Sequence, residues 1–193
     1  MATPKQTALY VDENLTPSVQ RDQPIPEHSD REETLYSGTN PADLKHATLL
    51  GISPAVLGYD FCGKVLRASP SSIFQPGQIV AGYTSPGVGR PPKYGTHQGY
   101  LVCPEEMAFR VPGNLPRSHA ACLGVVAMTA ADALFILFGF PLPGQSVHDK
   151  PLGSILIWDA SSSVGLCAVQ LARASGVCIS NLRHRIPGKT SVA

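Results

Sequence analysis

The segment SILIWDASSSVGLCAVQLARASG, residues 154–176, decides how the second half of the chain folds. Its unbroken apolar run, 155–158, is followed directly by small residues, which is typical of a strand buried on both faces of a parallel sheet. The small residues 160–163 predict a tight turn. The apolar pattern of 164–175 then predicts a helix, with Gly176 at its C′ position. We therefore expect a strand, a turn and a helix in this order.

The turn at the centre of this segment is a candidate anion site. A strand that turns through small residues into a helix directs backbone N–H groups and the positive helix end toward one point. The glycine fingerprint of dinucleotide-binding turns falls on Ala160, Ser162 and Gly165, so only its last glycine is present. A dinucleotide site and an ordinary turn without a ligand both remain open. The candidate cofactor-binding residues are Ala160, Ser161, Ser162, Ser163, Val164 and Gly165.

Composition argues against several classes of partner. The 193 residues, 43% of them hydrophobic, are enough to bury a core, and the net charge of +1 gives no general attraction to nucleic acid or to an anionic membrane. The N-terminus has no apolar core of signal-peptide length. Residues 120–142 form an apolar stretch, but Thr129 and Asp132 in its middle favour a buried helix over a membrane span, with Ser118 as its N-cap. We expect a cytoplasmic protein that binds neither nucleic acid nor membrane.

Cysteine and histidine spacing gives no metal signature. The five cysteines form no C-x-x-C pair and are odd in number, which favours reduced, mostly buried thiols over disulfides or metal ligands. His46, His97 and His119 are scattered without ligand spacing, so each is expected to be an ordinary surface or core histidine.

The chain changes character along its length. Nearly all of its 18 prolines and 18 glycines precede residue 154, which predicts a loop-rich, mostly β first part. The turn at Asn40-Pro41 is followed by Asp43 as a helix cap, and residues 12–33 read as irregular. In the loop 85–95, Gly87-x-Gly89 and Lys93 resemble a phosphate loop only superficially, because no helix pattern follows. Strands are expected at 7–11, 57–66, 79–83, 99–103 and 107–111.

Six motifs, in this order and spacing, resemble the medium-chain dehydrogenase/reductase superfamily. The likeness covers residues 5 to 177, and within the superfamily it is to the fungal trans-acting enoyl reductases that work beside polyketide synthases. It implies an α/β chain with a GroES-like β-rich catalytic domain over 1–117 and part of a Rossmann domain over 118–193. The motifs are NPADLK, LGYDFCGKV, FQPGQIV, YGTHQGYLVCPEEMAFRVP, ACLGVVAMTAADALF and ILIWDASSSVGLCAVQLARASG.

The resemblance implies an NADPH-dependent oxidoreductase. Its reaction would be reduction of the α,β-unsaturated thioester of a polyketide intermediate, by hydride transfer to the β-carbon and protonation at the α-carbon. The implied partners are the acyl-carrier-bound substrate of a polyketide synthase and a full-length reductase or synthase. Two alternatives stay open: a quinone or enone reductase of the same superfamily, and a non-catalytic GroES-like binding module.

Two residues carry the implied chemistry. Lys45 follows the N-P-x-D motif of the catalytic cleft, where an ammonium holds the cofactor or the developing enolate oxygen. Thr129 falls at the helix position that reaches the nicotinamide amide. From the residues alone, a solvated lysine and a threonine bonded to its own helix are equally good interpretations. Asp43 is interpreted as a cap rather than a base, and Tyr59 as a packed aromatic.

The resemblance also implies a metal-free site. In the alcohol-dehydrogenase branch the catalytic zinc is held at positions that fall here on Asn40, Tyr59 and Val125. None of these side chains supplies a thiolate or an imidazole.

Two departures from the family lower the expected activity. We expect one strand to be shortened at 33–37, and after Gly176 only 177–180 begin a further strand, whereas a Rossmann sheet has about six. No acidic residue follows Asp159; the basic residues there are Arg173, Arg183, Arg185 and Lys189. The last dozen residues do not resemble the family and are given no cofactor contacts. We therefore expect a C-terminally truncated form that is weak or inactive unless a partner chain completes it.

Overall fold

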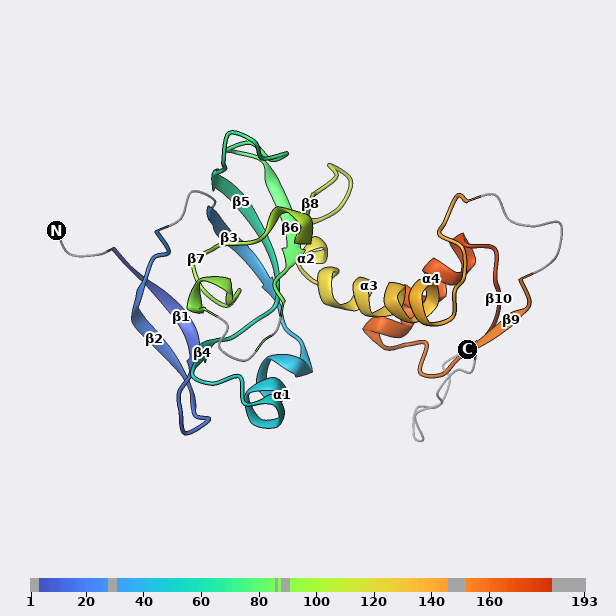
Figure 1. Ribbon diagram of the computed structural model, residues 1–193, viewed down its shortest axis with the longest axis horizontal. Helices are drawn as coiled ribbons and strands as arrows, with labels where there is room; N and C mark the ends of the chain where they lie inside the picture. Colours follow the sequence, from blue (N-terminus) through green and yellow to red (C-terminus); the bar gives the residue numbers. More distant parts are fainter. Residues whose placement is uncertain (1–3, 28–30, 86, 88–90, 146–151, 182–193) are drawn as a thin grey trace, which may run out of the picture. The chain divides into compact units, whose positions relative to one another are not determined.

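The computed structural model describes residues 4–27, 31–85, 87, 91–145 and 152–181 (Figure 1). The chain divides into two compact units, Met1–Val125 and Val126–Ala193. The sequence predicts a division after residue 117. The difference arises because helix α2 (Arg117–Ala120) packs on the first unit, where Ala120 and Ala121 share an apolar cluster with Cys62 and Ala81.

A five-stranded antiparallel sheet is the centre of the first unit. Its central strand, β5, is buried on both faces over Asp60–Gly63, and Phe61 and Cys62 are fully buried. A cluster of apolar side chains that includes Phe61 forms the core on one face. The strand order is β7 (Tyr100–Leu101), β3 (Arg31–Gly38), β5 (Asp60–Arg67), β6 (Ile79–Tyr83) and β8 (Ala108–Arg110).

A second, three-stranded sheet has β1 (Lys5–Val11) between β2 (Pro17–Pro24) and β4 (Ala55–Val56). The prediction that 12–33 is irregular was wrong, because β2 lies within it and pairs with β1 along most of its length. The side chains of β2 are mostly polar and exposed, so its sequence shows no apolar alternation. Strand β3 also runs through 33–37, where the sequence predicted a shortened strand.

The remaining elements of the first unit are short. Helix α1 (Pro41–Leu50) follows β3, and two 3-10 helices, η1 (Pro92–Tyr94) and η2 (Glu105–Met107), flank β7. Lys93 of the loop that resembles a phosphate loop lies in η1, with Nζ 5.0 Å from the centre of the Tyr94 ring. Gly89 of that loop lies outside the described residues.

The second unit contains the predicted strand, turn and helix. Strand β9 (Ser154–Ile157) leads through a turn into α4 (Ser163–Ala174), and β10 (Cys178–Asn181) pairs with β9 in parallel. Gly176 follows α4 with φ +80°, which confirms its predicted position after the helix. Most of α3 (Gly124–Ala131) and all of the π-helix η3 (Asp132–Leu137) belong to this unit. Its core contains Leu134, Ala172 and Val177.

The prediction that 155–158 is buried on both faces was wrong. Leu156 is 58% exposed and Trp158 76% exposed. Within the described part of the chain, β9 has β10 as its one neighbouring strand, and the apolar cluster of this unit takes in Ile155 but not Leu156. The run 155–158 therefore has more apolar side chains than its described neighbours bury.

The single buried helix predicted over 120–142 was also wrong. The helical segment is interrupted between α2 and α3, and Met128, Ile136 and Leu137 are exposed. The N-cap of α2 is Pro116, with φ −57° and ψ 136°, rather than Ser118. A proline fixes φ at a value that suits a helix entry, so the helix begins two residues earlier than predicted. Among the described residues, no helix is long and apolar enough to cross a membrane.

Candidate functional site

The start of α1 organises the polar centre of the first unit. Asn40 is extended, with φ −122° and ψ 149°, and Pro41 follows at the first helical position. The N–H of Asn40 donates to Oδ2 of Asp43 over 2.7 Å, and the N–H of Asp43 donates to the Asn40 carbonyl over 3.0 Å. This reciprocal pair satisfies helix-start groups that lack intrahelical partners. Asn40-Pro41, predicted as a turn, is the helix start, with Asn40 at the N-cap; the predicted capping role of Asp43 is confirmed, because its side chain accepts from the N–H of Asn40.

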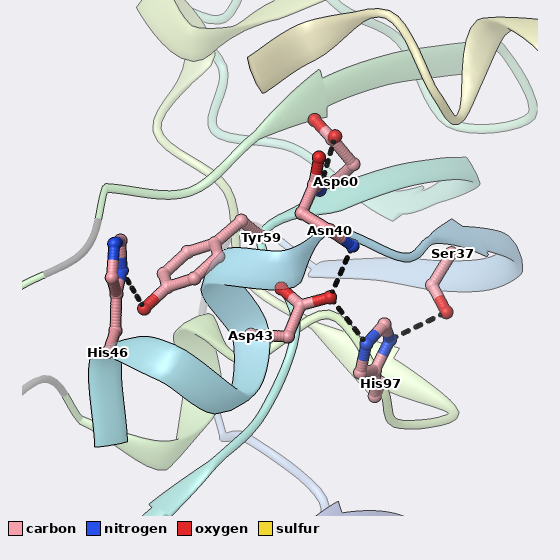
Figure 2. A network of polar contacts seen from close by, with 7 residues as sticks. All are labelled: Ser37, Asn40, Asp43, His46, Tyr59, Asp60 and His97. Atoms are coloured by element: carbon pink, nitrogen blue, oxygen red, sulfur yellow. Dashed lines mark hydrogen bonds and ion pairs between the residues drawn. The ribbon is translucent and has the colours of Figure 1, made fainter. Parts of the chain in front are cut away.

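Asp60 connects this helix start to the start of α3. Its Oδ2 accepts from Nδ2 of Asn40 over 2.8 Å (Figure 2), and its Oδ1 accepts from the N–H of Val125 over 2.7 Å. The side chain is almost fully buried, and burial raises the pKa of Asp60 to about 6, against the opposing effect of these two hydrogen bonds. A Cβ at Gly124 would lie 2.6 Å from Oδ1, so glycine is required there.

His97 lies between a serine and a carboxylate. Its Nδ1 lies 2.9 Å from Oγ of Ser37, which is on β3, and its Nε2 lies 3.3 Å from Oδ2 of Asp43 (Figure 2). The His97 backbone is held by hydrogen bonds to Leu9 and Leu57. Gly58, with φ +92°, packs so closely that a Cβ there would lie 2.7 Å from the ring. The imidazole is therefore fixed in position.

Tyr59 and His46 form a separate pair. Oη of Tyr59 lies 2.9 Å from Nδ1 of His46, and the two rings meet edge to face with centroids 5.3 Å apart. Tyr59 is buried, which confirms its interpretation as a packed aromatic. The third histidine, His119, is exposed on α2.

These contacts bear on the three positions that hold zinc in the alcohol-dehydrogenase branch. The amide of Asn40 donates to Asp60, the hydroxyl of Tyr59 contacts His46, and Val125 contributes its backbone N–H. The described ranges contain no group of three His, Cys, Asp or Glu side chains placed to hold a metal ion. The donor set at these positions does not fit zinc, which is usually held by thiolate, imidazole and carboxylate groups.

The two predicted catalytic residues lie on different units. Lys45 is exposed on α1, where its carbonyl accepts from Oγ1 of Thr48 over 3.1 Å. Thr129 is exposed on the part of α3 that belongs to the second unit. Their catalytic roles stay predictions.

The turn between β9 and α4 is built on one glycine and one serine. Oγ of Ser162 accepts from the N–H of Gly165 over 3.1 Å and donates to the Asp159 carbonyl over 2.9 Å. A Cβ at Gly165 would lie 2.4 Å from that carbonyl oxygen and 2.8 Å from Cα of Ala160. Only glycine allows this approach, which is the role of the last glycine in dinucleotide-binding turns.

The turn offers a limited set of groups to an anion. Ser163 and Val164 occupy the first turn of α4, where N–H groups have no intrahelical partner. The N–H of Gly165 is already bonded to Ser162, and the hydroxyl of Ser161 lies 3.4 Å from Oδ1 of Asp159. The predicted cofactor residues thus lie together in one turn, but they differ in whether their N–H groups are available to an anion. Of the basic residues noted after Asp159, Arg173 is exposed on α4, whereas Arg183, Arg185 and Lys189 lie outside the described residues.

Sequence reasoning missed both polar groups of the first unit. Ser37 and Asp43 are close in sequence, but His97 lies 54 positions after Asp43 and shares no motif with them, and Asp60 falls inside the expected strand 57–66. Asp60 carries the one usable signal, since a carboxylate inside an apolar strand requires buried partners.

The comparisons with known proteins agree with this architecture. Residues 33–113 match the alcohol dehydrogenase GroES-like domain. A trans-enoyl reductase of Aspergillus sclerotiorum is 31% identical over 148 residues, which are 71% of this chain and 42% of that protein. The chain spans about half the length of the curated relatives it matches.

Solved structures show the same fold. The quinone oxidoreductase from Coxiella burnetii superposes with a TM-score of 0.71 at 22% identity, covering 92% of this chain and 56% of that one. Mycobacterial Rv1454c, solved in complex with NADPH, superposes with a TM-score of 0.67 at 18% identity, covering 91% of this chain and 52% of that one. At these identities the likeness establishes the α/β fold with its GroES-like part.

Proposed function

We propose, because the chain belongs to the medium-chain dehydrogenase/reductase superfamily, that it acts as an NADPH-dependent trans-acting enoyl reductase. The substrate would be the α,β-unsaturated thioester of a polyketide intermediate, presented on the acyl carrier of a synthase. Similarity to trans-enoyl reductases supports the reaction class. The close packing of Gly165 on Asp159 and Ala160 carries the cofactor part of the proposal, because it forms the strand-to-helix turn that dinucleotide sites use.

The residues of this turn fit a dinucleotide. The N–H groups of Ser163 and Val164 would hold the pyrophosphate, assisted by the positive end of α4. Ser162 keeps the turn closed through its bonds to Gly165 and Asp159. When bound, the nicotinamide supplies the hydride for the β-carbon.

Lys45 and Thr129 are assigned the remaining roles. An exposed ammonium at Lys45 would stabilise negative charge on the enolate oxygen that develops as the double bond is reduced. The hydroxyl of Thr129 would orient the nicotinamide amide. We assign no step to zinc, because the side chains of Asn40 and Tyr59 are poor zinc ligands and are bonded to Asp60 and His46.

The test is reduction of a model enoyl thioester, crotonyl-N-acetylcysteamine. The loss of NADPH fluorescence measures the rate. We expect slow turnover that Lys45→Ala lowers about 100-fold, as removal of an electrostatic stabiliser does in other enzymes. The matched control is Lys64→Ala, which removes an exposed lysine of β5 and should leave turnover unchanged. Reduction of a quinone but not of the thioester would make the chain a quinone reductase instead. Capture of a synthase without any NADPH oxidation would make it a non-catalytic module.

A further inference from the structure

The Ser37, His97 and Asp43 side chains form an arrangement that the proposed hydride transfer does not use. Ser37 lies near the end of β3, His97 comes from the segment before β7, and Asp43 lies in the first turn of α1 (Figure 2). The distances are 2.9 Å from Oγ of Ser37 to Nδ1 of His97 and 3.3 Å from Nε2 of His97 to Oδ2 of Asp43. A hydroxyl, a base within its reach and a third group that orients the base are the parts of an activated nucleophile.

The hydrogen-bond pattern determines which nitrogen carries the proton. An ionised carboxylate only accepts hydrogen bonds, so Nε2 of His97 must donate to Oδ2 of Asp43. In neutral imidazole this leaves the lone pair on Nδ1, which then accepts the hydroxyl proton of Ser37. The ring is held in this orientation by Gly58 and by the backbone bonds of His97. Ser37 is therefore positioned to give up its proton.

The burial of Asp43 favours this proton transfer. The residue is 4% exposed, and within the described part of the chain its Oδ1 has no hydrogen-bond partner. A buried carboxylate with an unsatisfied oxygen is stabilised when the neighbouring imidazole becomes positively charged. The imidazolium formed when His97 accepts the proton would thus meet a compensating charge, as in serine hydrolases.

The hydroxyl of Ser37 is accessible from solvent. The side chain is exposed, and β7 pairs with β3 only at Glu32 and Glu33, so this ladder ends before Ser37. Leu35 and Tyr36, the two residues before Ser37 on β3, are 37% and 48% exposed, so this end of the strand is open to solvent. An acyl donor can therefore approach Ser37.

We propose that Ser37 is an acylation site that accepts an acyl group from an activated ester or thioester. Oγ of Ser37 bonds to the carbonyl carbon while its proton passes to Nδ1 of His97. The C–S bond of the thioester then breaks, and the leaving thiolate takes the proton from Nδ1. The products are O-acylated Ser37 and a free thiol, and no oxidant or reductant is consumed. This proposal does not rest on the enoyl reductase activity.

A fluorophosphonate tests the site, because it reacts with activated serine hydroxyls. The full chain should take up one label, located on Ser37 by peptide mass spectrometry, and Ser37→Ala should abolish it. His97→Gln should slow labelling about 100-fold, the usual contribution of a general base. The controls Ser18→Ala, on an exposed serine of β2, and His46→Gln should label at the wild-type rate. S-acetyl-N-acetylcysteamine should acetylate the same residue after neutral hydroxylamine has removed cysteine thioesters.

Asp43 is tested as a positioning residue by measuring two kinetic parameters of labelling separately. Asp43→Asn should lower the labelling rate at saturating probe and leave the half-saturating probe concentration unchanged, whereas a general loss of structure would change both. The proposal is overturned if Ser37→Ala labels as fast as wild type, or if wild type and His97→Gln label at the same rate. Because Ser37 is exposed, its alanine variant should fold, and an unchanged urea midpoint checks this.

Discussion

Strand β9 has the more apolar sequence of the two, but β5 is the more deeply buried strand. Strand β5 lies between β3 and β6, and its residues Asp60–Gly63 are buried on both faces. In β9, which pairs with β10 alone among the described residues, Leu156 is 58% exposed. The burial of a strand is therefore determined by the elements packed beside it and not by the apolar content of its own sequence.

The same contrast holds for the polar groups at helix starts. In the first unit Asp43 and Asp60 are buried, and each is bonded to Asn40 at the start of α1. In the second unit the start of α4 is capped by Ser162, a partly exposed hydroxyl. The first unit therefore depends more on buried charge, and the two units should respond differently to mutation and to pH.

The largest difference is expected between two aromatic side chains. Phe61 is fully buried in the first unit, so Phe61→Ala should lower the free energy of unfolding by about 3–5 kcal/mol. Trp158 is 76% exposed in the second unit, so Trp158→Ala should change it by less than about 0.5 kcal/mol. Urea unfolding of both variants measures this. Equal losses of unfolding free energy would contradict the difference between the two units, because they would show that Trp158 is covered in solution.

A smaller effect should come from Asp60. Burial raises its folded-state pKa from 3.8 to about 6, so the folded state keeps a proton that the unfolded chain has lost. This contribution to stability is fully present below pH 3.8 and is lost as the pH rises through about 6. Its size is at most about 3 kcal/mol. Asp60→Asn should flatten the profile of unfolding free energy against pH over this range, and a profile parallel to wild type would refute the assignment.

The smallest effect concerns the cap of α4. Ser162→Ala removes the acceptor for the Gly165 N–H and should destabilise the second unit by about 1 kcal/mol. Ser161→Ala is the matched control, because its hydroxyl makes only a 3.4 Å contact with Asp159 and should cost close to nothing. Thermal unfolding followed by circular dichroism compares the two. Equal losses from both variants would mean that Ser162 does not cap the helix.

The sequence predicts local structure where neighbouring residues determine it. The capping role of Asp43, the helix after Ser162 and the position of Gly176 all follow from backbone chemistry within a few residues. The exposure of Trp158 could not be predicted, because it depends on which strands lie beside β9. The site at Ser37 could not be predicted either, because it depends on a contact between β3 and a residue 60 positions later, which leaves no periodic pattern in the sequence.

Cofactor binding depends most on the turn that enters α4, and titration of the wild-type chain and of Ser163→Glu with NADPH tests this turn most directly. Glutamate at this exposed position places a carboxylate where a phosphate would bind, and it should not harm the helix, because a negative charge is favourable at a helix start. Ser180→Glu, on exposed β10, is the matched control. We predict weak, saturable NADPH binding that Ser163→Glu lowers about tenfold or more and Ser180→Glu preserves. No binding to the wild-type chain, or equal binding to wild type and Ser163→Glu, would contradict the account.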